Sequence, residues 1–145
     1  MIELSKGTTR LTMVRPDVNE PYYRGTRFDR SGIILSLEHG GRSYISQWFH
    51  EYDPFKHDAV SGPAEEFSPI GYDEAVPGGG FLKLGVGLLE KDENEYDRFH
   101  LYKTLDEGEW LLESGADHAD FTHRLSTGGF AYCYHKKVSI PEEGL

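Results

Sequence analysis

The chain has 145 residues, enough for one domain with a buried core, and its 37% apolar and 13% aromatic content exceeds that of a disordered acidic chain. Its formal net charge of −10 at pH 7 would repel a phosphate backbone or an anionic membrane, so we expect neither nucleic acid nor membrane as a partner. No stretch approaches the apolar run of a signal peptide or of a spanning helix, which predicts a cytoplasmic location.

Glycines and prolines are scattered along the whole chain and interrupt every helical period, which favours strands and turns. The first clear element is residues 32–46, where two apolar stretches flank His39-Gly40-Gly41-Arg42. Because Gly-Gly supplies the positive φ angles of tight hairpin turns, this segment predicts a β-hairpin.

Residues 47–80 hold four of the seven prolines and seven acidic residues against one lysine. The composition predicts long ordered loops. Such loops are uncommon inside a compact domain and are usually functional, so we expect the functional site here.

Residues 81–89 are almost continuously apolar and predict one buried central strand, in which Gly85 and Gly87 allow a bulge or a close backbone approach. Short β-rich runs follow at regular intervals and predict an antiparallel meander. These runs are residues 98–104, 109–113, 119–125 and 130–140.

These elements together predict an all-β protein, a single antiparallel β-sandwich domain over residues 1–145. The single cysteine, Cys133, lies among alternating apolar residues and is expected to be a buried thiol. Residues 141–145 are the one candidate linker.

The segment SGPAEEFSPIGYDEAVPGGGFLKLGVGLLEK, residues 61–91, resembles the first half of the galactose mutarotase-like superfamily, which includes aldose 1-epimerases and hexose-6-phosphate epimerases. The hairpin at 32–46, the loop Ser61-Gly62-Pro63 and the turn Gly80-Phe81 occur in the order of that family. The resemblance implies part of a supersandwich fold, a sugar substrate and interconversion of anomers by general acid/base catalysis. It implies no cofactor.

The chain departs from the family at a His-Gly-Phe-Ala-Arg turn, whose counterpart here is Gly79 to Lys83. The histidine is missing, while Lys83 keeps a positive charge. The family's remaining catalytic groups come from a second half that this chain does not resemble. Half of a supersandwich should expose an apolar sheet face, so we expect a homodimer. A non-catalytic carbohydrate-binding or assembly module is the alternative function.

Mutarotation needs one base and one acid near the anomeric carbon. The candidates are Glu65 and Glu66, of which one at most should face the ligand because neighbouring strand residues point to opposite faces, and His57, which has Asp58 beside it. The alternatives are solvated loop carboxylates and a surface histidine.

The candidates for substrate binding combine charged and aromatic side chains. Arg27 and Asp29 could bind a sugar or form an internal ion pair, and aromatic residues such as Trp48 could stack on a pyranose ring or pack in the core. The full set is Arg27, Asp29, Trp48, Tyr72 and Lys83.

Carboxylates in the 47–80 segment could offer oxygen ligands to Ca²⁺. The spacing of Asp53, Asp58, Asp73 and Glu74 matches no defined calcium loop, so no metal is expected.

Overall fold

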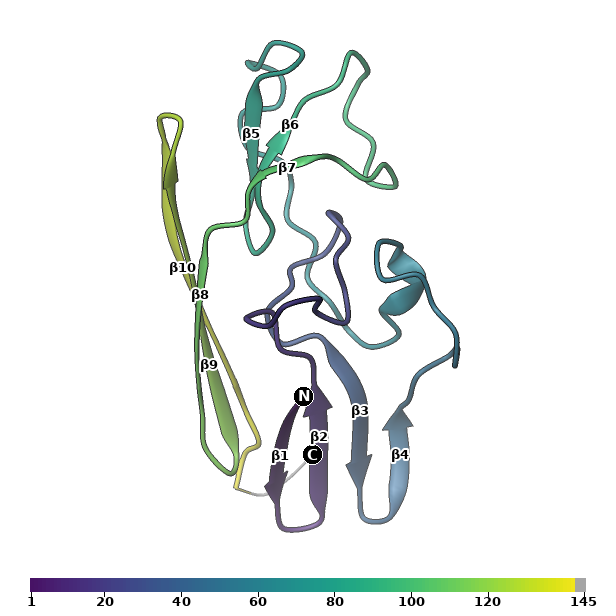
Figure 1. Cartoon of the computed structure of the whole chain (residues 1–145). Coiled ribbons are helices and arrows are strands. Elements are labelled where there is room, and N and C mark those ends of the chain that lie inside the picture. The colour runs from purple at the N-terminus through teal and green to yellow at the C-terminus, as the bar shows by residue number, and fades with distance from the viewer. Residues whose placement is uncertain (143–145) are drawn as a thin grey trace.

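The computed structural model describes residues 1–142 and is built from antiparallel strands with one short 3₁₀ helix (Figure 1). The last residues of the candidate linker, 143–145, lie outside the described residues. The elements are β1 (Ile2–Lys6), β2 (Thr9–Met13), β3 (Ile34–His39), β4 (Arg42–Ile45), η1 (His57–Ala59), β5 (Gly80–Lys83), β6 (Gly87–Glu90), β7 (Thr104–Asp106), β8 (Glu109–Ser114), β9 (His118–Thr127) and β10 (Phe130–Ser139).

The strands form three sheets: an N-terminal sheet in the order β1-β2-β3-β4, a middle sheet in the order β5-β6-β7, and a C-terminal sheet in the order β10-β9-β8. Each sheet is a meander in which strands that follow one another in sequence pair side by side. The predicted all-β antiparallel fold is confirmed, as is the β3–β4 hairpin, whose turn residues Gly40 and Gly41 have positive φ.

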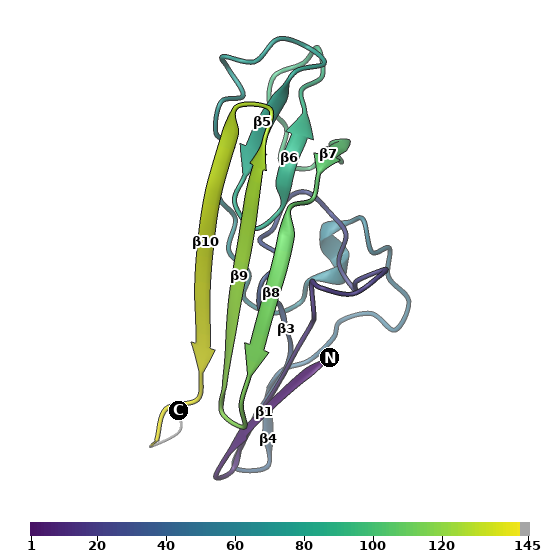
Figure 2. The same ribbon diagram turned by 60° about the vertical axis from the view of Figure 1, so that its left-hand side comes forward.

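The long C-terminal sheet packs against both other sheets, one at each end (Figure 2). Along β9 every second residue from Ala119 to Leu125 is buried, as a strand with one face on a core requires. Ala119 and Phe121 pack on the N-terminal sheet, where they meet Ile2, Leu4, Leu11 and Met13. Leu125 packs on Leu82 and Leu88 of the middle sheet.

A polar belt separates these two cores. Asp29 is 1% exposed; its carboxylate accepts hydrogen bonds from the Ser31 amide (2.9 Å) and the Tyr134 hydroxyl (2.8 Å). His123 is fully buried and stacks on Trp110, with ring centroids 4.0 Å apart. Buried polar groups need such partners. The hydrogen bonds of these residues therefore help to fix how the two halves of the molecule, the N-terminal sheet and the middle sheet with their loops, pack on the C-terminal sheet that they share.

The prediction of one strand over residues 81–89 is wrong. The chain reverses after Lys83, so the apolar run forms two short paired strands, β5 and β6. The cause is Gly85, whose φ of 73° takes the chain through a tight turn. The predicted close backbone approach is present, because a Cβ on Gly85 would lie 2.0 Å from the Asp29 carboxylate.

Two other expectations need correction, and one element has no counterpart among the sequence predictions. Residues 98–103 form a loop rather than a strand, and β7 begins only at Thr104. Cys133 is exposed, because on β10 the even-numbered side chains face inward and the odd-numbered ones face solvent. The N-terminal hairpin of β1 and β2 was not predicted.

The long loops predicted for residues 47–80 are present, with η1 and one isolated bridge between Ile70 and Leu82 as their regular structure. The expected apolar outer sheet face is not found in the described residues. The N-terminal sheet exposes Glu3, Arg10 and Glu38, and the C-terminal sheet exposes Arg124, His135 and Lys137. The large apolar side chains exposed on these two sheets are isolated ones, Tyr44 on β4 and Leu111 on β8. Residues 1–142 contain no helix long and apolar enough to cross a membrane.

Candidate functional site

A cavity of about 480 Å³ lies between three loops. We call them the Arg27 loop (residues 22–30), the His57 loop (53–59) and the Arg98 loop (91–103). The volume falls within the roughly 300–1,000 Å³ of small-molecule sites. The cavity is lined by Tyr23, Thr26, Arg27, Asp53, Phe55, Lys56, His57, Asp58, Arg98, Phe99, His100 and Leu101.

The Arg27 loop is shaped by Tyr23, a buried residue that packs with Ile33 and Leu35 on the N-terminal sheet. Its hydroxyl accepts hydrogen bonds from the backbone amides of Arg27 (3.2 Å) and Phe28 (3.1 Å). Gly25 lets the ring lie against the backbone, because a Cβ there would be 2.5 Å from ring atoms. This packing fixes the position from which the Arg27 side chain enters the cavity.

The His57 loop is tied to the Arg27 loop by a hydrogen bond from the Arg24 amide to the Pro54 carbonyl (2.6 Å). The Arg24 guanidinium lies over the Phe55 ring, with its Cζ 4.7 Å from the centroid. His57 is half exposed, its Nε2 lies 3.2 Å from the Asp58 carboxylate, and its ring meets the Phe99 ring edge-on at 5.7 Å. Two aromatic rings, Phe55 and Phe99, therefore wall the cavity.

The Arg98 loop is closed by Asp97, whose carboxylate accepts a hydrogen bond from the Phe99 amide (2.9 Å) and whose own amide donates to the Tyr102 hydroxyl (2.8 Å). Such Asx turns are a usual conformation for aspartate in loops. Thr26 joins this loop to the Arg27 loop, because its hydroxyl accepts a hydrogen bond from the Tyr102 amide (3.2 Å).

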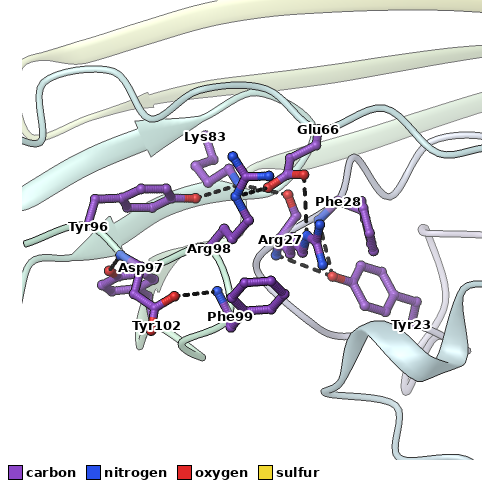
Figure 3. Close-up of polar contacts among 10 residues, drawn as sticks. All are labelled: Tyr23, Arg27, Phe28, Glu66, Lys83, Tyr96, Asp97, Arg98, Phe99 and Tyr102. Carbon is purple, nitrogen blue, oxygen red and sulfur yellow. Dashed lines mark hydrogen bonds and ion pairs between the residues drawn. The ribbon is translucent and has the colours of Figure 1, made fainter.

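Glu66, which lines a neighbouring cavity together with Arg98 and Tyr96, lies between two guanidinium groups (Figure 3). Its carboxylate is 3.3 Å from Arg27 Nε and 3.5 Å from Arg98 Nε. Lys83 lies beside this cluster with no exposed surface, and its ammonium donates to the Arg27 carbonyl (2.7 Å) and the Tyr96 hydroxyl (2.9 Å).

The ionisation of this cluster follows from its burial and its charges. Burial lowers the pKa of Lys83 to about 8; Glu66 opposes this shift, and the positive charges of Arg27 and Arg98 add to it. Burial, with Glu66 nearby, raises the pKa of Tyr96 to about 12. At neutral pH the tyrosine stays protonated and Lys83 is mostly charged.

The structure brings together four of the eight residues predicted for the site. Arg27 and His57 line the cavity, and Glu66 and Lys83 do not line it but both contact Arg27. The internal ion pair considered for Arg27 exists, but its partner is Glu66 rather than Asp29.

Glu65 and Asp29 belong to a different neighbourhood. Both approach the Lys136 ammonium, which lies 3.6 Å from Asp29 Oδ2 and forms an ion pair with Glu65. Glu65 lines a separate cavity of about 270 Å³ between the N-terminal and C-terminal sheets. Glu65 and Glu66 thus contact different partners, as expected of neighbouring extended residues, and Asp29 is enclosed by the polar belt.

Trp48 and Tyr72 lie away from the cavity. The Trp48 side chain is 73% exposed. Tyr72 is buried in the aromatic cluster of the middle sheet, with its ring edge-on to Phe81, and its hydroxyl donates to the Asn94 carbonyl (2.7 Å). Core packing, the alternative considered for the aromatic candidates, is what the structure shows for Tyr72.

Arg98, Phe99 and His100 line the cavity but are not among the residues predicted for the site, because the β-rich run 98–104 predicts a strand. A signal was present in the preceding run KDENEYD, whose seven residues include five acids or amides and favour a loop. The pairing of Arg98 with a glutamate 32 positions earlier has no counterpart in the sequence pattern.

No group of three or more His, Cys, Asp or Glu side chains within residues 1–142 is placed to hold a metal ion. Comparison of the chain with protein-family models, with curated proteins and with solved structures gave no match. The resemblance to the galactose mutarotase-like superfamily therefore stays a prediction from the sequence.

Proposed function

We propose that this protein binds a carbohydrate in the cavity between the Arg27, His57 and Arg98 loops. The observation that carries the proposal is the composition of the cavity: two aromatic rings, Phe55 and Phe99, stand beside hydrogen-bonding groups of both charges. A pyranose ring has apolar C–H faces, which aromatic rings can cover, and a rim of hydroxyls, which charged side chains bind strongly.

Binding without catalysis is the better supported form of this proposal. Of the three catalytic candidates only His57 lines the cavity, whereas Glu65 pairs with Lys136 in another cavity and Glu66 pairs with Arg27 and Arg98. Mutarotation requires an acid and a base that both reach the sugar ring. His57 beside Asp58 supplies one such group.

The binding proposal is tested by titrating the protein with a panel of neutral aldoses, followed by NMR chemical shifts. At least one sugar should bind, and Phe99→Ala should weaken its binding about tenfold, which corresponds to roughly 1.4 kcal/mol of stacking and burial. Trp48→Ala is the matched control, because it removes an exposed aromatic side chain outside the cavity. Weakening by Trp48→Ala alone would move the site to another surface.

The catalytic alternative, an aldose 1-epimerase-like activity, is tested by adding the pure α-anomer of the bound sugar and following optical rotation. We expect the spontaneous rate. Acceleration that disappears in His57→Gln would instead support an anomer-interconverting enzyme with His57 as its acid or base.

A further inference from the structure

The cluster around Glu66 has more positive than negative charge. Three cations, Arg27, Lys83 and Arg98, gather around one carboxylate, Glu66. Among residues 1–142, the hydrogen-bond acceptors of Lys83 are a carbonyl and a phenol, neither of which carries a charge. This local excess of positive charge is opposite in sign to the formal net charge of the chain, which is −10. An anion would therefore be attracted to this cluster and not to the protein as a whole.

Arg27 is held in place before any ligand arrives. Its guanidinium lies between two aromatic rings, with Cζ 4.7 Å from the centroids of both Phe28 and Phe99. Its Nε is buried and has no hydrogen-bond acceptor among residues 1–142, although the Glu66 carboxylate lies within ion-pair distance. A side chain fixed in this way loses little entropy on binding an anion.

The two arginines line the same cavity and share one counter-ion. Arg98 is the more accessible, with 56% of its side chain exposed, while 20% of the Arg27 side chain is exposed. Guanidinium groups bind oxyanions through directed, charge-assisted hydrogen bonds. The missing negative charge can therefore be supplied from within the cavity.

The opposite wall limits the charge of that anion. Asp53 and Asp58 line the cavity together with one cation, Lys56, and this excess of negative charge would repel a phosphate dianion more strongly than a carboxylate with its single charge. We propose that the sugar bound in the cavity is an acidic sugar, of the uronic acid type, whose carboxylate binds Arg27 and Arg98. This inference rests on the proposed function and adds the class of sugar to it.

The test compares matched pairs of sugars by calorimetry at pH 7 and low salt: D-glucuronate with D-glucose, and D-galacturonate with D-galactose. In one pair at least, the acid should bind about tenfold or more tightly than the neutral sugar, since a charge-assisted hydrogen bond is stronger than a neutral one. The preference should shrink as sodium chloride is added.

Arg98→Gln should remove the preference for the acid, whereas Arg42→Gln, which removes an exposed arginine on the β4 hairpin, should keep it. Equal binding of acid and neutral sugar in both pairs would refute the carboxylate contact and leave the proposed function standing. Tighter binding of D-glucose 6-phosphate than of D-glucuronate would also refute it. Binding of none of these sugars would overturn the proposed function together with this inference.

Discussion

Gly85 is a residue at which backbone conformation and packing act together. Its φ of 73° belongs to the left-handed region, and its Cα faces the carboxylate of Asp29 at the centre of the polar belt. Gly78 has a similar φ of 85° but lies in open space. The two glycines therefore separate the cost of the backbone conformation from the cost of the close approach.

We expect Gly85→Ala to destabilise the fold clearly more than Gly78→Ala. The Gly78 change should cost about 1 kcal/mol, the price of a left-handed non-glycine residue, and the Gly85 change about 2 kcal/mol more, because Asp29 must move. Denaturant unfolding of both variants measures the difference. Equal costs would mean that the Asp29 region yields without loss.

His123 is a buried titratable group with a defined proton. A carbonyl can only accept, so Nε2 must donate to the Glu107 carbonyl (2.6 Å), which leaves Nδ1 to accept from the Tyr132 hydroxyl (2.8 Å). Burial lowers the pKa of His123 below its ordinary value, and the nearby Arg30 adds to the effect. The folded state thus favours the neutral ring.

A histidine whose pKa is lower in the folded state stabilises the fold above its unfolded pKa. This stability is lost as the pH falls from about 6.5 towards the folded value, since the unfolded chain takes up the proton first. We expect the urea midpoint of the protein to fall over this range and the fall to be smaller in His123→Gln. The exposed His50→Gln is the control and should retain the full pH dependence.

At the site, the sequence predicted some of the residues that line the cavity, but it did not predict which residues they contact. Arg27 and His57 were identified from charged or polar loop segments, which is where cavities with hydrogen-bonding walls form. The pairing of Arg27 with Glu66 could not be predicted, because it depends on how two loops far apart in sequence meet. Asp29 lies in the same charged stretch of sequence as Arg27, but it is buried in the polar belt and does not line the cavity.

At the scale of elements, β9 is the central strand of the C-terminal sheet and contributes side chains to both cores. It pairs with β8 on one side and β10 on the other, and its buried residues reach both cores. β4 is the opposite case, an edge strand with mostly exposed side chains. Local stability should differ accordingly, because protection follows burial and pairing.

We expect the amides of β9 to exchange with solvent most slowly of all strands, at rates set by global unfolding, and those of β4 to exchange several orders of magnitude faster. Native-state hydrogen exchange followed by NMR measures both. Fast exchange in β9 at conditions where the protein stays folded would show that the two cores open separately from the shared sheet.

The strands that the sequence predicted well are those with an unambiguous turn or alternation. Gly40-Gly41 marks a hairpin because few other residues adopt both positive φ angles, and the alternation in residues 119–125 fits one face on a core. The prediction of a single strand over residues 81–89 failed because side chains buried on both faces give no alternation of apolar and polar residues. Gly85 was the available sign that the chain turns within this run.

At the scale of the whole molecule, the exposed side chains of the N-terminal and C-terminal sheets are mostly polar in the described residues, with Tyr44 and Leu111 as isolated apolar ones, which removes the reason given for a homodimer. The dimer itself stays a prediction, and sedimentation velocity measures it. Tyr44, on the edge strand β4, is an exposed aromatic residue of the N-terminal sheet, and the exposed aromatic residues Trp48, Phe49 and Phe55 follow β4 in the loops.

The shared C-terminal sheet predicts that the chain unfolds in one cooperative transition, as expected of a single domain. Trp110 lies in this sheet and reports on its packing, so its fluorescence in a Trp48→Phe background should change together with far-UV circular dichroism. Transitions at different urea concentrations would indicate two independently stable halves.

The loops that form the cavity are attached to two different hydrophobic cores. Tyr23 and Ala59 anchor the Arg27 and His57 loops to the core above the N-terminal sheet, while Tyr102 anchors the Arg98 loop to the core of the middle sheet. The width of the cavity is therefore set by the angle at which two halves rest on a common support. Substitutions in the polar belt, which does not line the cavity, would therefore change the cavity width and with it the size of ligand that fits. A bound ligand would in turn stabilise the packing of the two halves against each other.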